Sequence, residues 1–174
     1  MPEISLDVVA TERLDLVLLP REWLSVVHSG GPPPDLGFTD PYGFLADEHD
    51  LVGIRLDQLA TRPTDAPWLL RAIVLRETGA AVGHVNFHGA PDERGAVEIG
   101  YTVVPQMRRL GVARETARAM WDWAAANGAT LLRASVAPDN EPSQRLIRAE
   151  GFTYIGDQVD EVDGVEQVFE RPVH

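Results

Sequence analysis

The chain has 174 residues, 44% of them hydrophobic and 24% charged, and this predicts one globular domain over residues 1–174. It has no cysteine, which excludes disulfides, thiolate metal ligands and a cysteine nucleophile. The formal net charge of −12 argues against a nucleic-acid partner, whose phosphates would be repelled. No apolar run approaches the roughly 18 residues of a membrane span. The start Met1-Pro2-Glu3 does not resemble a secretory signal, so we expect a cytoplasmic protein.

The first half of the chain predicts helices around an antiparallel hairpin. Pro20 ends the first strand, Gly30 to Pro34 form a loop, and Glu77-Thr78-Gly79 is the hairpin turn. We expect, in chain order, a strand over 14–19, helices over 21–28 and around 51–60, and strands over 68–76, 81–88 and 96–104.

In the second half, hydrophobic residues recur at three- and four-residue steps, which indicates an amphipathic helix that ends at Asn127-Gly128. A strand over 130–136 follows, and Asn140 caps a helix that runs to Gly151. Residues 152–156 and 165–170 predict a final strand pair around an acidic loop. The fold class is therefore α/β with a mixed sheet.

Basic charge gathers at the start of the amphipathic helix. Residues 107–118 hold four arginines and one acid, whereas residues 157–170 hold six acids and no base. A helix N-terminus with unpaired N–H groups, adjacent arginines and Gly111 is typical of a phosphate site. A solvated basic helix start explains the segment equally well. A dinucleotide fingerprint and a P-loop are both absent.

The neighbouring motifs resemble those of one family. Glu98-Ile99-Gly100-Tyr101, Pro105 and the R-x-x-G-x-A pattern of 108–113 are similar to the central cofactor motif of the GNAT acetyltransferases. Residues 136–143, followed by Gly151-Phe152, are similar to the next motif. Their order resembles the bacterial RimJ/RimL-like branch, the ribosomal-protein N-terminal acetylases. This implies a GNAT fold: a largely antiparallel mixed sheet with a V-shaped splay between two parallel strands, and helices on both faces.

The resemblance also implies acetyl-CoA as the cosubstrate and an amine as the acceptor. The pantetheine arm would pair near Val103 and Val104, and Asn140 would contact it, although Asn140 also fits a plain helix cap. The pyrophosphate would lie on the backbone of Arg108, Arg109, Leu110, Gly111, Val112 and Ala113. Similar proteins are often homodimers.

Two residues are candidates for proton transfer. Glu98 in mid-strand should be partly desolvated, which would let it act as a base, directly or through water. It also fits an ordinary polar residue of a strand. Many GNAT enzymes carry a tyrosine where this chain has Ile147. The resemblance points instead to Ser143 as the acid, although its hydroxyl also fits a helix start. We expect direct attack by the amine in a ternary complex.

Alternation places His84, Asn86 and His88 on one face of a strand, where they would line the acceptor pocket. They lack a third ligand at a suitable spacing, so no metal site is expected. Acidic residues over 29–64 and 157–165 would attract a cationic acceptor or only solubilise the surface. The alternative function is a non-catalytic acyl-CoA-binding sensor, favoured by the missing tyrosine.

Overall fold

The computed structural model describes residues 7–174, apart from the side chains of Leu45 and Ala46. The acidic start at Met1-Pro2-Glu3 lies outside the described residues. Eight strands form one sheet in the order β1-β2-β3-β4-β5-β6-β8-β7. The strands are β1 Val8–Ala10, β2 Leu14–Leu18, β3 Arg71–Leu75, β4 Ala81–Phe87, β5 Ala96–Val103, β6 Leu131–Val136, β7 Thr153–Asp160 and β8 Gly164–Pro172.

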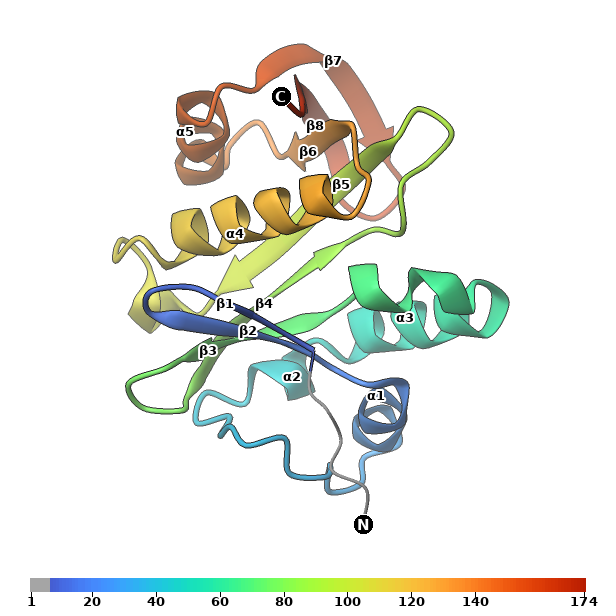
Figure 1. Cartoon of the computed structure of the whole chain (residues 1–174), viewed down its shortest axis with the longest axis vertical. Coiled ribbons are helices and arrows are strands. Elements are labelled where there is room, and N and C mark those ends of the chain that lie inside the picture. The colour runs from blue at the N-terminus through green and yellow to red at the C-terminus, as the bar shows by residue number, and fades with distance from the viewer. Residues whose placement is uncertain (1–6) are drawn as a thin grey trace.

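Among these strands only β5 and β6 pair in parallel, and every other neighbouring pair is antiparallel. The α4 helix crosses over between β5 and β6 (Figure 1), as a parallel connection requires. The predicted α/β class with a mixed, largely antiparallel sheet is confirmed.

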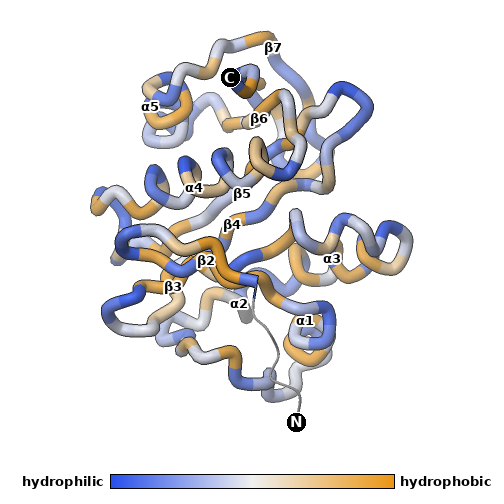
Figure 2. The backbone as a smooth tube through the Cα atoms, in the orientation of Figure 1, coloured by the Kyte–Doolittle hydropathy of each residue, from blue (hydrophilic) through white to orange (hydrophobic). Residues whose placement is uncertain are grey.

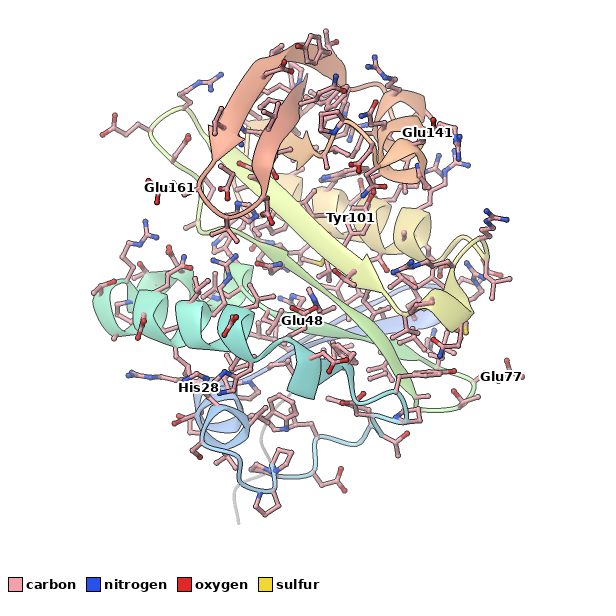
Figure 3. The ribbon with its side chains drawn as sticks, turned by 180° about the vertical axis from the view of Figure 1, so that it is seen from behind. His28, Glu48, Glu77, Tyr101, Glu141 and Glu161 are labelled. Atoms are coloured by element: carbon pink, nitrogen blue, oxygen red, sulfur yellow. The ribbon has the colours of Figure 1, made fainter. Side chains whose placement is uncertain are left out.

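Helices cover both faces of the sheet. The α4 helix lies on one face, and α1, α2 and α3 lie on the opposite face, which Figure 3 shows from behind. The helices are α1 Arg21–His28, α2 Phe44–Asp47, α3 His49–Thr61, α4 Val112–Ala126 and α5 Glu141–Ala149, with 3-10 turns η1 Pro63–Trp68 and η2 Pro105–Met107. Every one of these helices is too short or too polar to cross a bilayer, within residues 7–174.

The core lies between the sheet and these two helical layers. Figure 2 shows hydrophobic colour on the central strands, whereas α4 changes between hydrophilic and hydrophobic along its length. Its buried residues Ala117, Met120, Trp121 and Ala124 recur at the spacing read from the sequence. Burial of this stripe fixes α4 on the sheet, and with it the position of the arginine-rich turn at its N-terminus.

The strands differ from the predictions in three respects. Trp68 belongs to η1 and the strand begins only at Arg71, because Pro63 and Pro67 favour a turn that still buries the tryptophan. The strands β7 and β8 extend beyond the predicted pair, so most of the acidic loop is strand. The three-residue β1 is additional to the predicted strands.

Candidate functional site

The turn between β5 and α4 has an unusual backbone. Arg109 has a φ of 63°, and Gly111, the residue that caps α4, has a φ of 79°. Left-handed conformation costs a non-glycine residue roughly 1–2 kcal/mol. Two such residues turn the chain sharply. The first N–H groups of α4 therefore face the same side of the turn, and they lack acceptors within the helix. The first helical hydrogen bond comes only at Glu115, whose N–H donates to the Gly111 carbonyl at 3.1 Å.

Arg13, in the connection between β1 and β2, holds this turn from outside. Its Nη1 donates to the Leu110 carbonyl at 2.9 Å, and its Nε donates to Glu115 at 2.7 Å. Thr11 also donates to Glu115, at 2.7 Å. Arg13 had no predicted site role, because contacts across about a hundred residues leave no local signal in the sequence.

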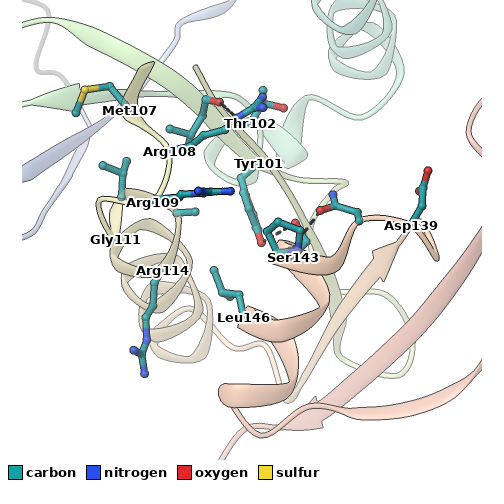
Figure 4. A pocket seen from close by; sticks show the side chains of 15 residues that line it. Tyr101, Thr102, Met107, Arg108, Arg109, Gly111, Arg114, Asp139, Ser143 and Leu146 are labelled. Carbon is teal, nitrogen blue, oxygen red and sulfur yellow. Dashed lines mark hydrogen bonds between the residues drawn. The ribbon is translucent and has the colours of Figure 1, made fainter. Parts of the chain in front are cut away.

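A pocket of about 790 Å³ lies between this turn, the end of β5 and the start of α5 (Figure 4). Its walls hold three arginines and one aspartate, so the lining carries net positive charge. The lining residues are Tyr101, Thr102, Val103, Met107, Arg108, Arg109, Gly111, Val112, Ala113, Arg114, Asp139, Asn140, Pro142, Ser143 and Leu146. Eight of the predicted cofactor residues are in this set: Val103, Arg108, Arg109, Gly111, Val112, Ala113, Asn140 and Ser143.

The other two predicted cofactor residues, Val104 and Leu110, do not line the pocket. The N–H of Val104 donates to the Val82 carbonyl at 2.9 Å, on the β4 side. Leu110 is an exposed residue of the turn. Their predicted role rested on the family resemblance and stays a prediction.

The pocket meets the sheet where its two parallel strands separate. Their register ends at the pair Ile99 and Ala134, although β5 continues to Val103. The backbone N–H of His88 donates to the Glu98 carbonyl, and the backbone N–H of Val104 donates to the Val82 carbonyl. The even-numbered residues of β5 therefore form their backbone hydrogen bonds with β4. Tyr101 and Val103 therefore direct their backbone groups toward the splay. Of these groups, the Val103 carbonyl accepts a hydrogen bond from Arg108 Nε at 3.0 Å.

Two hydroxyl groups approach each other in the pocket. The Tyr101 hydroxyl lies 3.5 Å from Ser143 Oγ, and the N–H of Ser143 donates to Asn140 Oδ1 at 3.3 Å. Burial raises the pKa of Tyr101, so its hydroxyl stays protonated. Ile147 is only 1% exposed and packs in the core. Tyr101 is the hydroxyl that the sequence analysis overlooked, although it belongs to the quoted motif.

Glu98 lies on the other face of the sheet, outside this pocket. Strand alternation places Glu98 with Gly100 and Thr102 on the α3 side, and Tyr101 with Val103 on the pocket side. Arg133 of β6 holds its Nε 3.4 Å from Glu98 and its Nη1 3.7 Å from Glu170. The two predicted proton-transfer residues, Glu98 and Ser143, therefore lie on opposite sides of the splay.

The predicted trio on β4 shares the face of Glu98, but each member has a different environment. The buried His84 lies with its Nε2 3.1 Å from Glu48, whose carboxylate pKa it lowers. Asn86 Oδ1 accepts from Arg55 of α3 at 2.6 Å. His88 is half-exposed, and its Nδ1 lies 3.9 Å from Glu98. Alternation thus predicted the face correctly, and only the fold brought Arg55, Glu48 and Arg133 to it.

Comparisons with known proteins identify the family of the chain. The model of the acetyltransferase (GNAT) domain matches residues 45–153. The uncharacterized N-acetyltransferase YoaA of Bacillus subtilis is 33% identical over 78 residues, and the match spans 44% of each chain, less than half of this relative.

Solved structures share the fold over nearly the whole chain. The ribosomal-protein-S5-alanine acetyltransferase of Vibrio fischeri superposes with a TM-score of 0.64 and 16% identity, covering 95% of this chain and 96% of that one. RimL, a ribosomal L7/L12 α-N-protein acetyltransferase solved with coenzyme A, gives 0.66 and 12%, covering 96% and 98%. At such identities the likeness concerns the fold.

Proposed function

This chain belongs to the acetyltransferase (GNAT) domain family, and we propose on that premise that it transfers the acetyl group of acetyl-CoA to a primary amine. The transfer is direct, in a ternary complex of enzyme, acetyl-CoA and amine. The observation that carries the proposal is the pocket between the left-handed turn and the splayed strands, because it offers phosphate-binding groups and a free strand edge together.

The pocket fits acetyl-CoA in two respects. Arg109 and the unpaired N–H groups at the start of α4 suit the pyrophosphate, because both donate hydrogen bonds to anions. The backbone groups of Tyr101 and Val103 on the open edge of β5, apart from the Val103 carbonyl that Arg108 contacts, suit the amide groups of the pantetheine arm. Acetyl-CoA supplies the activated acyl group. The chain orients it, and Ser143, with Tyr101 beside it, provides a proton for the leaving sulfur.

The acceptor amine approaches from the α3 face, where Glu98 lies with His88 and Asn86. Carboxylates outnumber guanidinium groups in this region. Glu98, Glu166 and Asp160 act on His88 and Glu48 lies beside His84, whereas the arginines are Arg55 and Arg133. This supports a cationic acceptor, such as a peptide N-terminus or a polyamine. The rate constant kcat/KM for such an acceptor should then fall as ionic strength rises, and a salt-independent value would contradict the steering role.

We also propose a cytoplasmic protein that forms a homodimer. Exposed apolar side chains on the β7–β8 hairpin support self-association, since Val159 is 79% exposed and Val162 is 89% exposed. Sedimentation of the purified protein measures the assembly, and a monomer at micromolar concentration would contradict it.

The function is tested in two steps. Calorimetric titration with acetyl-CoA should show binding, and a thiol-release assay should then show turnover with at least one amine among spermidine, tyramine and a short peptide with a free N-terminus. Initial rates against both substrates should give intersecting reciprocal plots, as a ternary complex requires. Absence of binding would overturn the proposal. Binding without thiol release would favour the non-catalytic sensor, for which the core position of Ile147 is the supporting observation.

A further inference from the structure

The imidazole of His88 lies along the face of β5, at the level where the parallel ladder ends. Its Nδ1 is 3.9 Å from Glu98 Oε2. Its Nε2 is 3.5 Å from the point where a side chain on Gly100 would begin. Gly100 follows Ile99, the last β5 residue paired with β6. The two ring nitrogens therefore face different groups: one faces a carboxylate, and the other faces the backbone at the opening of the splay.

We propose that His88 receives the proton of the acceptor amine, and that Glu98 is a positioning residue behind the imidazole rather than the base itself. This inference rests on the proposed acetyl transfer. The amine nitrogen forms the amide bond while the carbon–sulfur bond breaks. The nitrogen attacks as the neutral amine, its ammonium proton having been released to solvent, and it then loses one proton to His88 Nε2. The leaving sulfur takes one proton from the hydroxyl on the pocket side. His88 afterwards releases its proton to solvent, and the hydroxyl regains one from solvent.

The environment of Glu98 argues against a role as the direct acceptor. Arg133 Nε lies 3.4 Å from the same Glu98 oxygen, Oε2, that faces His88. The Glu98 side chain is only 20% exposed and that of His88 is 52% exposed, so an amine reaches the imidazole more readily than the carboxylate. Facing His88 Nδ1, the same carboxylate favours the tautomer that carries a proton on Nδ1 and a lone pair on Nε2. Glu98 is thus better placed to orient His88 than to replace it.

Desolvation keeps the His88 ring neutral, against most of the charges around it. Desolvation by the surrounding protein lowers the pKa of His88, even though the side chain is 52% exposed. Glu98 of β5 opposes this, Arg55 of α3 reinforces it, and Glu166 of β8 and Asp160 of β7 oppose it more weakly. The net direction is downward from the ordinary value. A neutral imidazole at neutral pH can accept a proton, and its half-exposed ring remains accessible to an amine.

The second histidine on this face provides a natural control. His84 is only 4% exposed, its Nε2 faces Glu48 at 3.1 Å, and its ring stacks on Phe44 with centroids 6.0 Å apart. Its partners enclose it, so it has no open nitrogen for a substrate. His84→Gln should therefore lower stability more than His88→Gln, without the change in pH profile expected for His88.

The test compares His88→Gln with Glu98→Gln in the pH profile of kcat/KM, using the amine of the panel that wild type turns over fastest. His88→Gln should lower kcat/KM by about 100-fold, since general-base catalysis contributes about 10²–10⁴-fold. It should also remove the acid limb of the profile, which is the fall in kcat/KM at low pH caused by protonation of the base. Glu98→Gln should lower it by about tenfold and keep the limb. That limb should move to lower pH, because Glu98 holds the pKa of His88 up. Acetyl-CoA affinity should be unchanged in both variants.

The reverse pattern, in which Glu98→Gln removes the limb and His88→Gln keeps it, would overturn the proposal. Nitrogen NMR of the His88 ring supplies a readout that needs no turnover: its pKa should lie below the ordinary value and fall further in Glu98→Gln. A ring that is charged at neutral pH would also overturn the proposal. Absence of thiol release by wild type would refute the proposed function, whereas normal release by His88→Gln would refute only the role of His88.

Discussion

The two faces of β5 are built in different ways. On the pocket side, the groups offered to a ligand are mainly backbone groups: the open edge at Tyr101 and Val103, and the N–H groups that follow the left-handed turn. On the α3 side they are side chains, contributed by α3, β4, β5, β6, β7 and β8. A backbone site depends on one local conformation, whereas a side-chain site depends on the packing of many elements. Changes on the pocket side should therefore alter acetyl-CoA affinity, and changes on the α3 side should alter turnover.

The largest effect is expected at Gly83, where the packing of β4 against β5 supports both faces. A Cβ at Gly83 would collide with the Thr102 carbonyl oxygen of β5, and this backbone atom cannot move without disturbing the strand. We expect Gly83→Ala to lower the free energy of unfolding by about 3 kcal/mol. Urea denaturation measures the loss. Gly100→Ala is the matched control, since its Cβ would lie 3.4 Å from Asn86 Nδ2. A similar loss in both variants would contradict the steric explanation.

Arg109 and Arg114 test whether affinity depends on the turn. Both line the pocket, but Figure 4 shows Arg109 extending toward Tyr101 and Arg114 pointing away. Arg114 Nε pairs with Glu150 at 2.8 Å. Arg109→Ala should weaken acetyl-CoA binding by about 10- to 100-fold, the value of a charge-assisted hydrogen bond. Arg114→Ala should change it by less than about threefold. Calorimetry measures the acetyl-CoA affinity of both variants. Equal effects would show that binding depends on the total charge of the pocket and not on the position of each arginine.

Arg133 tests the α3 face alone. It links Glu98 with Glu170 and donates to Gln158 at 2.7 Å, so it fixes the carboxylate behind His88. Arg133→Met should lower kcat by about tenfold through misplacement of Glu98, while leaving the acetyl-CoA affinity unchanged. Arg133→Lys should recover part of the rate. Arg94→Met is the control, because Arg94 contacts the same Glu170 at 3.1 Å from an exposed position. A fall in acetyl-CoA affinity in Arg133→Met would contradict the expectation that changes on the α3 side alter turnover alone.

The smallest effect is expected at Glu115, which holds Arg13 beside the turn. Although burial alone would raise the pKa of Glu115, hydrogen bonds from Thr11 and Arg13 outweigh it and lower the pKa. A lowered carboxyl pKa gives stability that is present above the unfolded value and is lost as pH falls through the folded value. Glu115→Gln should thus cost roughly 1 kcal/mol at neutral pH, discounted for partial exposure.

That difference should shrink as pH falls below the ordinary glutamate pKa of about 4.3, and it should disappear only below the lowered folded pKa, where the carboxyl of folded wild type is protonated as well. Denaturation across pH measures it. A loss of unfolding free energy that is independent of pH would show that the packing of the Glu115 side chain, and not its charge, holds Arg13. Acetyl-CoA affinity of Glu115→Gln should fall by about two- to threefold, because Arg13 is then held less firmly against the turn.

The sequence predicted the pocket side better than the α3 side, for a physical reason. The turn at 108–113 follows from local rules: a strand that ends near Pro105, a glycine free to adopt positive φ, and an amphipathic helix. Asn140 likewise caps α5 as its position predicted. On the α3 side, alternation placed His84, Asn86 and His88 on one face. It could not show which of them is enclosed, because Glu48 and Arg55 reach that face only through the folding of α2 and α3 against the sheet.

By itself the sequence determined the class of the fold and the helix whose N-terminus faces the pocket, because these depend on periodicity and turn residues. The parallel pair of strands was implied by the resemblance of its motifs. Only the tertiary structure decided that Glu98 and Ser143 lie on opposite sides of the splay, that Arg133 pairs with Glu98, and that His88 is the half-exposed histidine beside Gly100. These relations join residues that are distant in the chain. They are fixed by register and by the packing of whole elements, which no local pattern encodes.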